Sequence, residues 1–188
     1  MSMFEEEKVI YTKRLFMRKP IVEDIDQFYN ILKKDTVGKW LAKSRGMSKE
    51  ETNDYIGQLI LHWEQYDFGV WVLFNSETGK LLGHCGLRKV DETGEIEIMY
   101  LLDPEHWRNG YALEAAEASI KYAIETLNVT RIIARVKVAN ESSKNFYESS
   151  GLYILMKSII AGAYYHILNS IHHPKNSRHF IYFFIVKK

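Results

Sequence analysis

One stretch constrains this chain more than any other: a β-rich run over 95–102 that ends at Asp103-Pro104 and leads, through a short loop, into an alanine-rich helix over 111–127. The first turn of a helix has backbone N–H groups with no acceptor inside the helix. These groups and the helix dipole favour an anion, such as a pyrophosphate, at that end. The same pattern also fits a plain helix cap preceded by a glycine.

Three residues of the loop support the anion interpretation. Gly110 lets the backbone approach a ligand closely, Ala112 keeps the second contact point small, and Arg108 could add positive charge. The loop lacks the Gly-Lys-Ser/Thr ending of a Walker loop and the three glycines of a dinucleotide fingerprint. The sequence therefore predicts a phosphate site of a different kind.

Composition narrows the class of protein. The 188 residues suit one domain, and 25 Lys+Arg against 24 Asp+Glu give a net charge of +1. This balance argues against nucleic-acid binding as the main task. One cysteine, Cys85, excludes a disulfide scaffold and a cysteine-rich zinc site. We expect a cytoplasmic protein without a membrane span, because the start is acidic and no apolar run reaches ~20 residues.

Local periodicity predicts a single α+β domain over 1–188, with a mixed, mostly antiparallel twisted sheet and helices on both faces. A capping box, Ser48 to Glu51, starts one helix. The strand after the 111–127 helix should run parallel to 95–102, as in a crossover unit. The expected strands are 14–18, 69–74, 81–90, 95–102, 131–136, 152–160 and 179–186, and the expected helices are 25–32, 48–65, 111–127 and 142–149. Residues 161–178 receive no regular structure.

The loop Trp107 to Ala112 resembles the pyrophosphate loop of the GCN5-related N-acetyltransferases (GNAT), whose usual form is Gln/Arg-x-x-Gly-x-Gly/Ala. Trp107 replaces the usual first residue, as is common in the subfamily of ribosomal-protein N-terminal (alanine) acetyltransferases. Four further segments agree with that subfamily, so the resemblance covers about 12–160. They are Thr12 to Arg18, Gly83 to Leu87, Glu97 to Pro104, and Asn140-x-x-Ser143 with Tyr147 and Gly151-Leu152. Residues 161–188 diverge.

The resemblance implies an acetyl-CoA-dependent enzyme that acetylates a primary amine. The diphosphate would bind the backbone of Arg108, Asn109, Gly110, Tyr111 and Ala112, with Trp107 at the start of the loop. The pantetheine arm would pair with the strand end, which is Tyr100, Leu101 and Leu102. Asn140 and Ser143 would contact the CoA arm or cap the short helix that follows them, a task that serine performs well.

Two residues are candidates for proton transfer. The attacking amine must be neutral, so a general base is useful, and the leaving thiolate needs an acid. Alternation along 95–102 puts Glu97 on one face of the strand that leads to the cosubstrate site, and we expect it to be the base. The resemblance implies that Tyr147 is the acid, near the CoA sulfur. A solvated glutamate and a packing tyrosine are the structural alternatives.

The acceptor and the partners stay open in the sequence. A small-molecule amine or a protein N-terminus is expected as acceptor, since ribosomal-protein N-termini, polyamines, amino acids and amine antibiotics are all used across this fold family. The chain is expected to act as a monomer or homodimer, without a metal, because His172, His173 and His179 lack partners at ligand spacing. A non-catalytic CoA-binding module and a nucleotide-binding regulator are the alternative functions.

Overall fold

The computed structural model describes residues 8–91, 93–137, 139–143, 145, 153–160 and 163–171, with side chains up to residue 145 except that of residue 136. Eight strands and six helical segments are described. They are β1 (Ile10–Tyr11), β2 (Leu15–Arg18), η1 (Val22–Asp24), α1 (Ile25–Leu32), α2 (Asp35–Gly38), α3 (Lys49–Tyr66), β3 (Val70–Asn75), β4 (Leu81–Lys89), β5 (Ile96–Leu102), η2 (Pro104–His106), α4 (Tyr111–Glu125), β6 (Arg131–Lys137), β7 (Tyr153–Ile160) and β8 (Ala163–Ile171).

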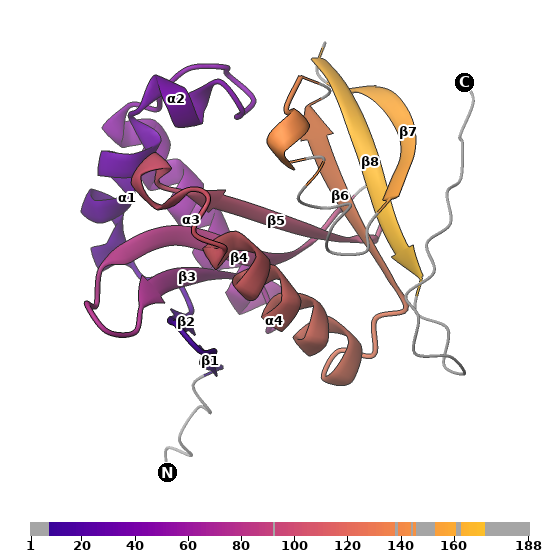
Figure 1. Ribbon diagram of the computed structural model, residues 1–188, viewed down its shortest axis with the longest axis horizontal. Coiled ribbons are helices and arrows are strands. Elements are labelled where there is room, and N and C mark those ends of the chain that lie inside the picture. Colours follow the sequence, from indigo (N-terminus) through magenta and orange to yellow (C-terminus); the bar gives the residue numbers. More distant parts are fainter. Residues whose placement is uncertain are drawn as a thin grey trace.

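The strands form one sheet in the order β1-β2-β3-β4-β5-β6-β8-β7. Every neighbouring pair is antiparallel except β5 and β6, which are parallel and joined through α4. The predicted mixed, mostly antiparallel sheet and the parallel crossover are therefore confirmed. Figure 1 shows β6, β8 and β7 turned away from the other strands.

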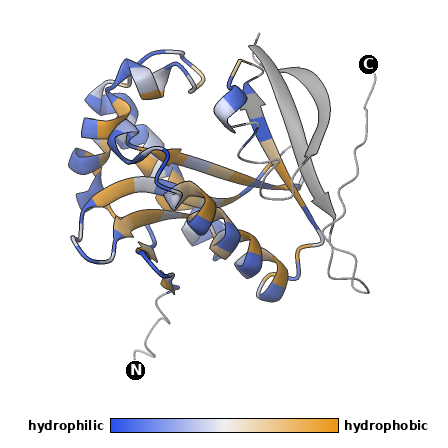
Figure 2. Cartoon of the chain, in the orientation of Figure 1, coloured by the Kyte–Doolittle hydropathy of each residue, from blue (hydrophilic) through white to orange (hydrophobic). Residues whose placement is uncertain are grey.

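Helices cover both faces of the sheet, as predicted. On one face, α4 packs its alanines against apolar side chains of β4 and β5, among them Leu87 and Ile98. On the other face, α1 and α3 pack Phe28 and Ile56 against β3 (Figure 1). Hydrophobic residues run along β3, β4 and β5 in Figure 2, as expected for strands that are covered on both sides.

The helix α3 begins at its predicted capping box. The Ser48 side chain accepts a hydrogen bond from the Glu51 N–H, and the Glu51 side chain accepts one from the Ser48 N–H. The reciprocal pair satisfies two backbone donors at the start of the helix. Asp67 ends α3 in the left-handed conformation, with φ 58°.

One sequence expectation about the fold is wrong. Residues 163–171, which were given no regular structure, form β8 and pair with both β6 and β7. Tyr, Ile and Leu in this segment favour a strand, and strand pairing satisfies the backbone of the interspersed His166 and Asn169. The predicted strand 179–186 and most of the predicted helix 142–149 lie outside the described residues.

The parallel pair β5 and β6 prepares the site. The two strands pair at Ile96 with Ile132 and at Glu97 with Ile133, both near the start of the strands. Beyond these pairs the two strands diverge (Figure 1). Residues of both strands line a cavity. None of the described helices combines the length and the apolar composition that a membrane span requires.

Candidate active site

The loop before α4 presents a run of available backbone donors. The N–H groups of residues 108–113 make no hydrogen bond to any described residue, and the first helical bond of α4 is donated by the N–H of Glu114 to Gly110. Arg108 and Gly110 both adopt positive φ, 63° and 79°. The left-handed conformation turns the chain sharply into the helix. This end of α4 therefore has the geometry of an anion site.

Arg14 supports the loop from the neighbouring sheet. Its Nη1 donates to the Asn109 carbonyl at 2.8 Å, and its guanidinium lies 4.6 Å from the centre of the Tyr111 ring. Arg14 Nε also donates to Glu114 Oε2 at 2.6 Å. Thr12 Oγ1 donates to the other oxygen of Glu114 at 2.6 Å. These contacts fix the loop on β2 and its preceding turn.

Glu114 is an anion in the first turn of a helix that is suited to bind another anion. Burial would raise the pKa of Glu114, but hydrogen bonds from Thr12 and Arg14 and the charge of Arg14 hold it below its ordinary value. The carboxylate is thus ionised and paired. Its charge is largely neutralised by Arg14, so it repels a ligand phosphate less than an unpaired glutamate would.

A cavity of about 780 Å³ extends from this loop into the space between β5 and β6. Most of the sequence-predicted site residues line it. Those residues are Glu97, Tyr100, Leu101, Leu102, Trp107, Arg108, Gly110, Tyr111, Ala112, Asn140 and Ser143. Asn109 is not part of the lining and contributes its carbonyl to Arg14. Tyr147 lies outside the described residues.

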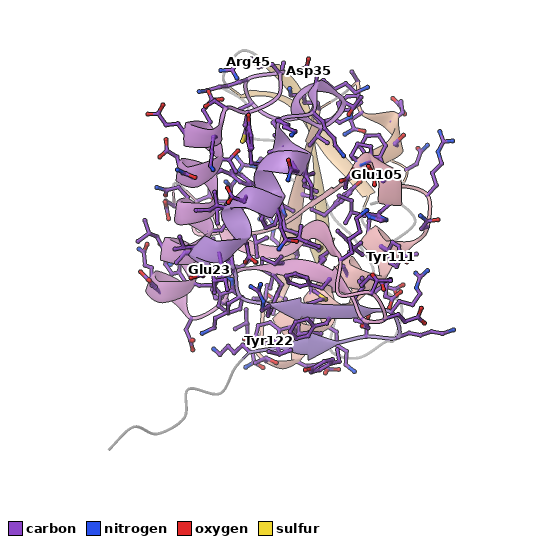
Figure 3. All side chains as sticks on the ribbon, turned by 90° about the vertical axis from the view of Figure 1, so that its left-hand side faces the viewer. Glu23, Asp35, Arg45, Glu105, Tyr111 and Tyr122 are labelled. Atoms are coloured by element: carbon purple, nitrogen blue, oxygen red, sulfur yellow. The ribbon has the colours of Figure 1, made fainter. Side chains whose placement is uncertain are left out.

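The cavity has two differently lined parts, because side chains alternate along β5. Ile98 belongs to the face that packs on α4, whereas Met99 and Leu101 pack with the α1 and α3 face. The phosphate loop, Tyr100 and Ser143 form the first part. Glu97, Val37 at the end of α2 and the segment 39–42 after α2 form the second part. Figure 3 shows Tyr111 and Glu105 one above the other at the edge of the molecule where the loop lies.

Two side chains bridge β5 to the turn after β6. The hydroxyls of Tyr100 and Ser143 are 2.8 Å apart, and the Ser143 N–H donates to Asn140 Oδ1 at 3.2 Å. Because Asn140 accepts this bond, Asn140 rather than a serine caps the turn. Burial raises the pKa of the Tyr100 hydroxyl. Trp107 closes the opposite side, where its Nε1 donates to the Leu102 carbonyl at 2.9 Å.

Glu97 is buried and held by two arginines. Arg135 binds it through Nε at 2.8 Å and Nη2 at 2.6 Å, and Arg88 binds it through Nη2 at 2.5 Å. Burial would raise the pKa of Glu97, but the hydrogen bonds and charges of Arg135 and Arg88 outweigh it and lower the pKa. Glu97 is thus an ionised carboxylate on the floor of the cavity, 4% exposed.

Several lining residues were not anticipated from the sequence. Arg88, Arg135 and Lys137 lie on strands β4 and β6, and Lys39 and Leu41 lie after α2. A sequence signal for Arg88, Arg135 and Lys137 does exist. They alternate along their strands with core residues such as Leu87 and Ala134, so all three lie on the face of the sheet opposite to that core. No sequence signal marked the segment after α2.

Two other chemistries find little support in the described part of the chain. Cys85 is fully buried outside the cavity, and burial raises the pKa of its thiol to about 12. It is therefore a poor nucleophile. The residues described include no group of three or more His, Cys, Asp or Glu side chains that could hold a metal ion.

Comparisons with known proteins agree with this geometry. Residues 14–153 match the family model of the acetyltransferase (GNAT) domain. The uncharacterized N-acetyltransferase p20 of Bacillus licheniformis is 32% identical over 140 residues, which cover 72% of this chain and 77% of p20.

Two solved structures share the fold. One is a ribosomal L7/L12 α-N-protein acetyltransferase, RimL, in complex with coenzyme A, with a TM-score of 0.71 at 16% identity, covering 87% of this chain and 98% of that chain. The other is a spermidine N-acetyltransferase from Vibrio cholerae in complex with CoA and spermine, with a TM-score of 0.67 at 18% identity, covering 84% of this chain and 94% of that chain. Because the family match covers most of the chain, this protein belongs to the GNAT family of N-acetyltransferases.

Proposed function

We propose that this N-acetyltransferase moves the acetyl group of acetyl-CoA directly to a primary amine while both substrates are bound. The observation that carries the proposal is the run of N–H groups at residues 108–113 that donate to no described residue, at the mouth of a cavity that leads between β5 and β6. A diphosphate at that end would direct the rest of acetyl-CoA into the cavity. The acceptor amine, from a small molecule or a protein N-terminus, would enter from the part near Glu97.

The cosubstrate fits the lining residues in a definite order. The diphosphate would accept hydrogen bonds from the N–H groups of Arg108 to Ala112, with the Arg108 side chain at the rim. The pantetheine arm would follow Tyr100, Leu101 and Leu102 along β5. Asn140 and Ser143 would contact the arm from the turn after β6, opposite Trp107. Each of these side chains except that of Asn109 lines the cavity.

Direct attack is favoured over a covalent acetyl-enzyme. The buried thiol of Cys85 lies outside the cavity and has a raised pKa of about 12. The Ser143 hydroxyl is paired with the Tyr100 hydroxyl rather than with a described base. Holding the amine against the thioester can by itself supply a large part of the rate.

We propose Glu97 as the base, acting directly or through water. Its lowered pKa keeps the carboxylate ionised, but it also makes Glu97 a weak proton acceptor. Such a base suits an α-amine, with an ordinary pKa of about 7.7–8.0, better than a lysine amine at about 10.4. A neutral α-amine is already a sizeable fraction at neutral pH, so little proton removal is needed.

We propose Tyr147 as the acid that protonates the leaving thiolate. It follows the turn at Asn140 to Ser143 by four residues in the chain, and this turn borders the cavity. The phenol has an ordinary pKa near 10, above that of a thiol at about 8.5, so it would still carry its proton when the thiolate leaves.

Initial-rate kinetics test this function. Thiol release would be followed while acetyl-CoA and a primary amine are varied together. Intersecting double-reciprocal lines are expected for a complex that holds both substrates, and parallel lines would contradict direct attack. No release with any amine, despite CoA binding, would favour a non-catalytic CoA-binding module. Thermal stabilisation by ATP but not by CoA would favour a nucleotide-binding regulator.

A further inference from the structure

The part of the cavity near Glu97 is rich in positive charge. Among the described lining residues, Glu97 is the one carboxylate, and Arg88 and Arg135 both bind it. Two further cations also line the cavity, Lys137 four residues beyond the partner of Glu97 on β6 and Lys39 just after α2. Glu97 and Leu102 are five positions apart along β5, which is about 17 Å at ~3.4 Å per residue. Arg88, which is opposite Glu97 on β4, and Arg135, which binds Glu97 from β6, therefore lie far from the loop that is suited to the diphosphate, and their charge is available for the acceptor.

The two arginines are committed to Glu97 to different degrees. Arg135 uses two nitrogens on the two carboxylate oxygens. Arg88 uses Nη2 alone, and its Nε and Nη1 make no hydrogen bond to a described residue. The Arg88 side chain is 40% exposed and lines the cavity. Arg88 is therefore the guanidinium that can bind a second anion while it keeps its contact with Glu97.

The lysines play separate parts. Lys137 Nζ donates to the Leu41 carbonyl at 2.5 Å and to Ser44 Oγ at 2.9 Å, which ties the segment after α2 to β6 across the cavity. Lys39 Nζ lies 4.8 Å from the centre of the Trp40 ring, and both residues line the cavity. Lys137 thus holds the segment after α2 in place as one wall of the cavity, and Lys39 adds a second positive charge to this wall.

We propose that the acceptor is a primary amine that also bears a carboxylate, and that Arg88 binds that carboxylate. The proposal rests on the proposed function, because it names the acceptor of the same reaction. A guanidinium pairs with a carboxylate through two parallel hydrogen bonds, which fixes the orientation of the acceptor. A polyamine would instead bring several positive charges against these cations, which is unfavourable in a partly buried site. Amino acids and acidic peptide N-termini are the two sources of such an acceptor.

Thiol release with a matched acceptor set tests the proposal. The set contains Ala-Glu amide, Ala-Gln amide, free glutamate and spermidine, so that the first two differ in one carboxylate and the third tests free amino acids. We expect kcat/KM for Ala-Glu amide or for glutamate to exceed that for Ala-Gln amide by about tenfold, the value of ~1.4 kcal/mol of added binding. Whichever carboxylate acceptor is used better identifies the source. Equal rates for all acceptors, or faster turnover of spermidine, would overturn the proposal and leave the acetyltransferase function intact.

A variant assigns the effect to Arg88. Arg88→Met should bring the ratio between the carboxylate acceptor and Ala-Gln amide close to one, without changing the affinity for acetyl-CoA. Lys121→Met is the matched control, because it removes one positive charge from an exposed position on α4. A ratio that survives in Arg88→Met would contradict the role of Arg88. Titration of Ala-Glu amide into the CoA-bound protein gives a readout without turnover, and the absence of thiol release with every amine would instead contradict the proposed function.

Discussion

Arg14 Nε lies 2.6 Å from Glu114 Oε2, so a residue that precedes β2 holds the first turn of α4 although 100 residues separate the two in the chain. The same arginine holds the Asn109 carbonyl. Because Arg14 binds the Asn109 carbonyl, the peptide of the loop is oriented and its N–H groups can face a ligand. The relationship links the first strands of the sheet to the cosubstrate site.

Arg14→Ala should therefore weaken the binding of acetyl-CoA. The variant frees the loop and leaves the Glu114 carboxylate without its guanidinium, next to the diphosphate. We expect the Kd to rise about tenfold, in line with the loss of one charge-assisted contact. Isothermal titration measures this change. Arg14→Ala with Glu114→Gln should recover part of the affinity, since the unpaired charge is then gone; a Kd of Arg14→Ala equal to that of the wild type would refute this support.

Gly110→Trp should abolish CoA binding by blocking the approach of the diphosphate. Gly110 has φ 79°, and even a Cβ there would lie 3.3 Å from Arg14 Nη2. Gly79→Trp is the matched control, because Gly79 has φ 67° and a Cβ there meets nothing within 4 Å. Both variants should lose about 1–2 kcal/mol of unfolding free energy from left-handed strain. CoA binding, followed by titration, should be lost in Gly110→Trp alone, and normal binding there would disprove the placement of the cosubstrate.

Tyr147→Phe should lower kcat by about a hundredfold, the lower range for general acid catalysis, with little change in the Kd for acetyl-CoA. The ring remains and the proton donor is lost, so a packing role would leave kcat unchanged. Tyr11→Phe removes a hydroxyl from an exposed tyrosine and serves as the control. Stopped assays of acetylated product measure kcat directly. Wild-type turnover in Tyr147→Phe would remove this residue from the mechanism.

The stability of the fold should fall as the pH drops below 6.5, partly because of His62. Its Nε2 accepts the Lys89 N–H at 2.9 Å, so the neutral ring donates from Nδ1 to the Phe68 carbonyl at 2.9 Å. Burial lowers the pKa of His62 from its ordinary 6.5. The unfolded chain thus binds a proton first as the pH falls, which favours unfolding. Burial also lowers the pKa of His84, to about 3, which adds to the effect.

Urea unfolding at pH 7.5, 6.5 and 5.5 measures this dependence. One histidine can contribute at most about 1.4 kcal/mol per pH unit. His62→Gln keeps one donor and one acceptor but does not titrate, so it should show a shallower loss of unfolding free energy between pH 6.5 and 5.5 than the wild type. Carboxylates with lowered pKa values contribute only below their ordinary values near 4.5, outside this window. An identical pH slope in the two proteins would rule out His62.

The parts of the fold that were predicted are those with strong local signals. The capping box at Ser48 and the alanine-rich run after Gly110 identify α3 and α4, because caps and helix propensity act within a few residues. The strand β8 was missed because polar His166 and Asn169 interrupt its apolar residues. Its pairing with β6 depends on contacts that no local pattern contains.

The site was predicted in part for the same reason. The loop at Arg108 to Ala112 is a continuous motif, so its residues could be found in one stretch of sequence. Arg88 and Arg135 become site residues only through sheet register, because Arg88 is opposite Glu97 on β4 and Arg135 reaches it from β6. Read locally, each is a charged residue on a strand, which is common on solvated faces.

A crystal structure with bound acetyl-CoA would locate the diphosphate and the thioester on this protein. We expect diphosphate oxygens at about 2.7–3.2 Å from backbone nitrogens within residues 108–113, the normal range for an N–H···O hydrogen bond. We also expect the thioester in the gap between β5 and β6. A diphosphate bound elsewhere, with these N–H groups facing solvent or the protein, would refute the proposed cosubstrate site.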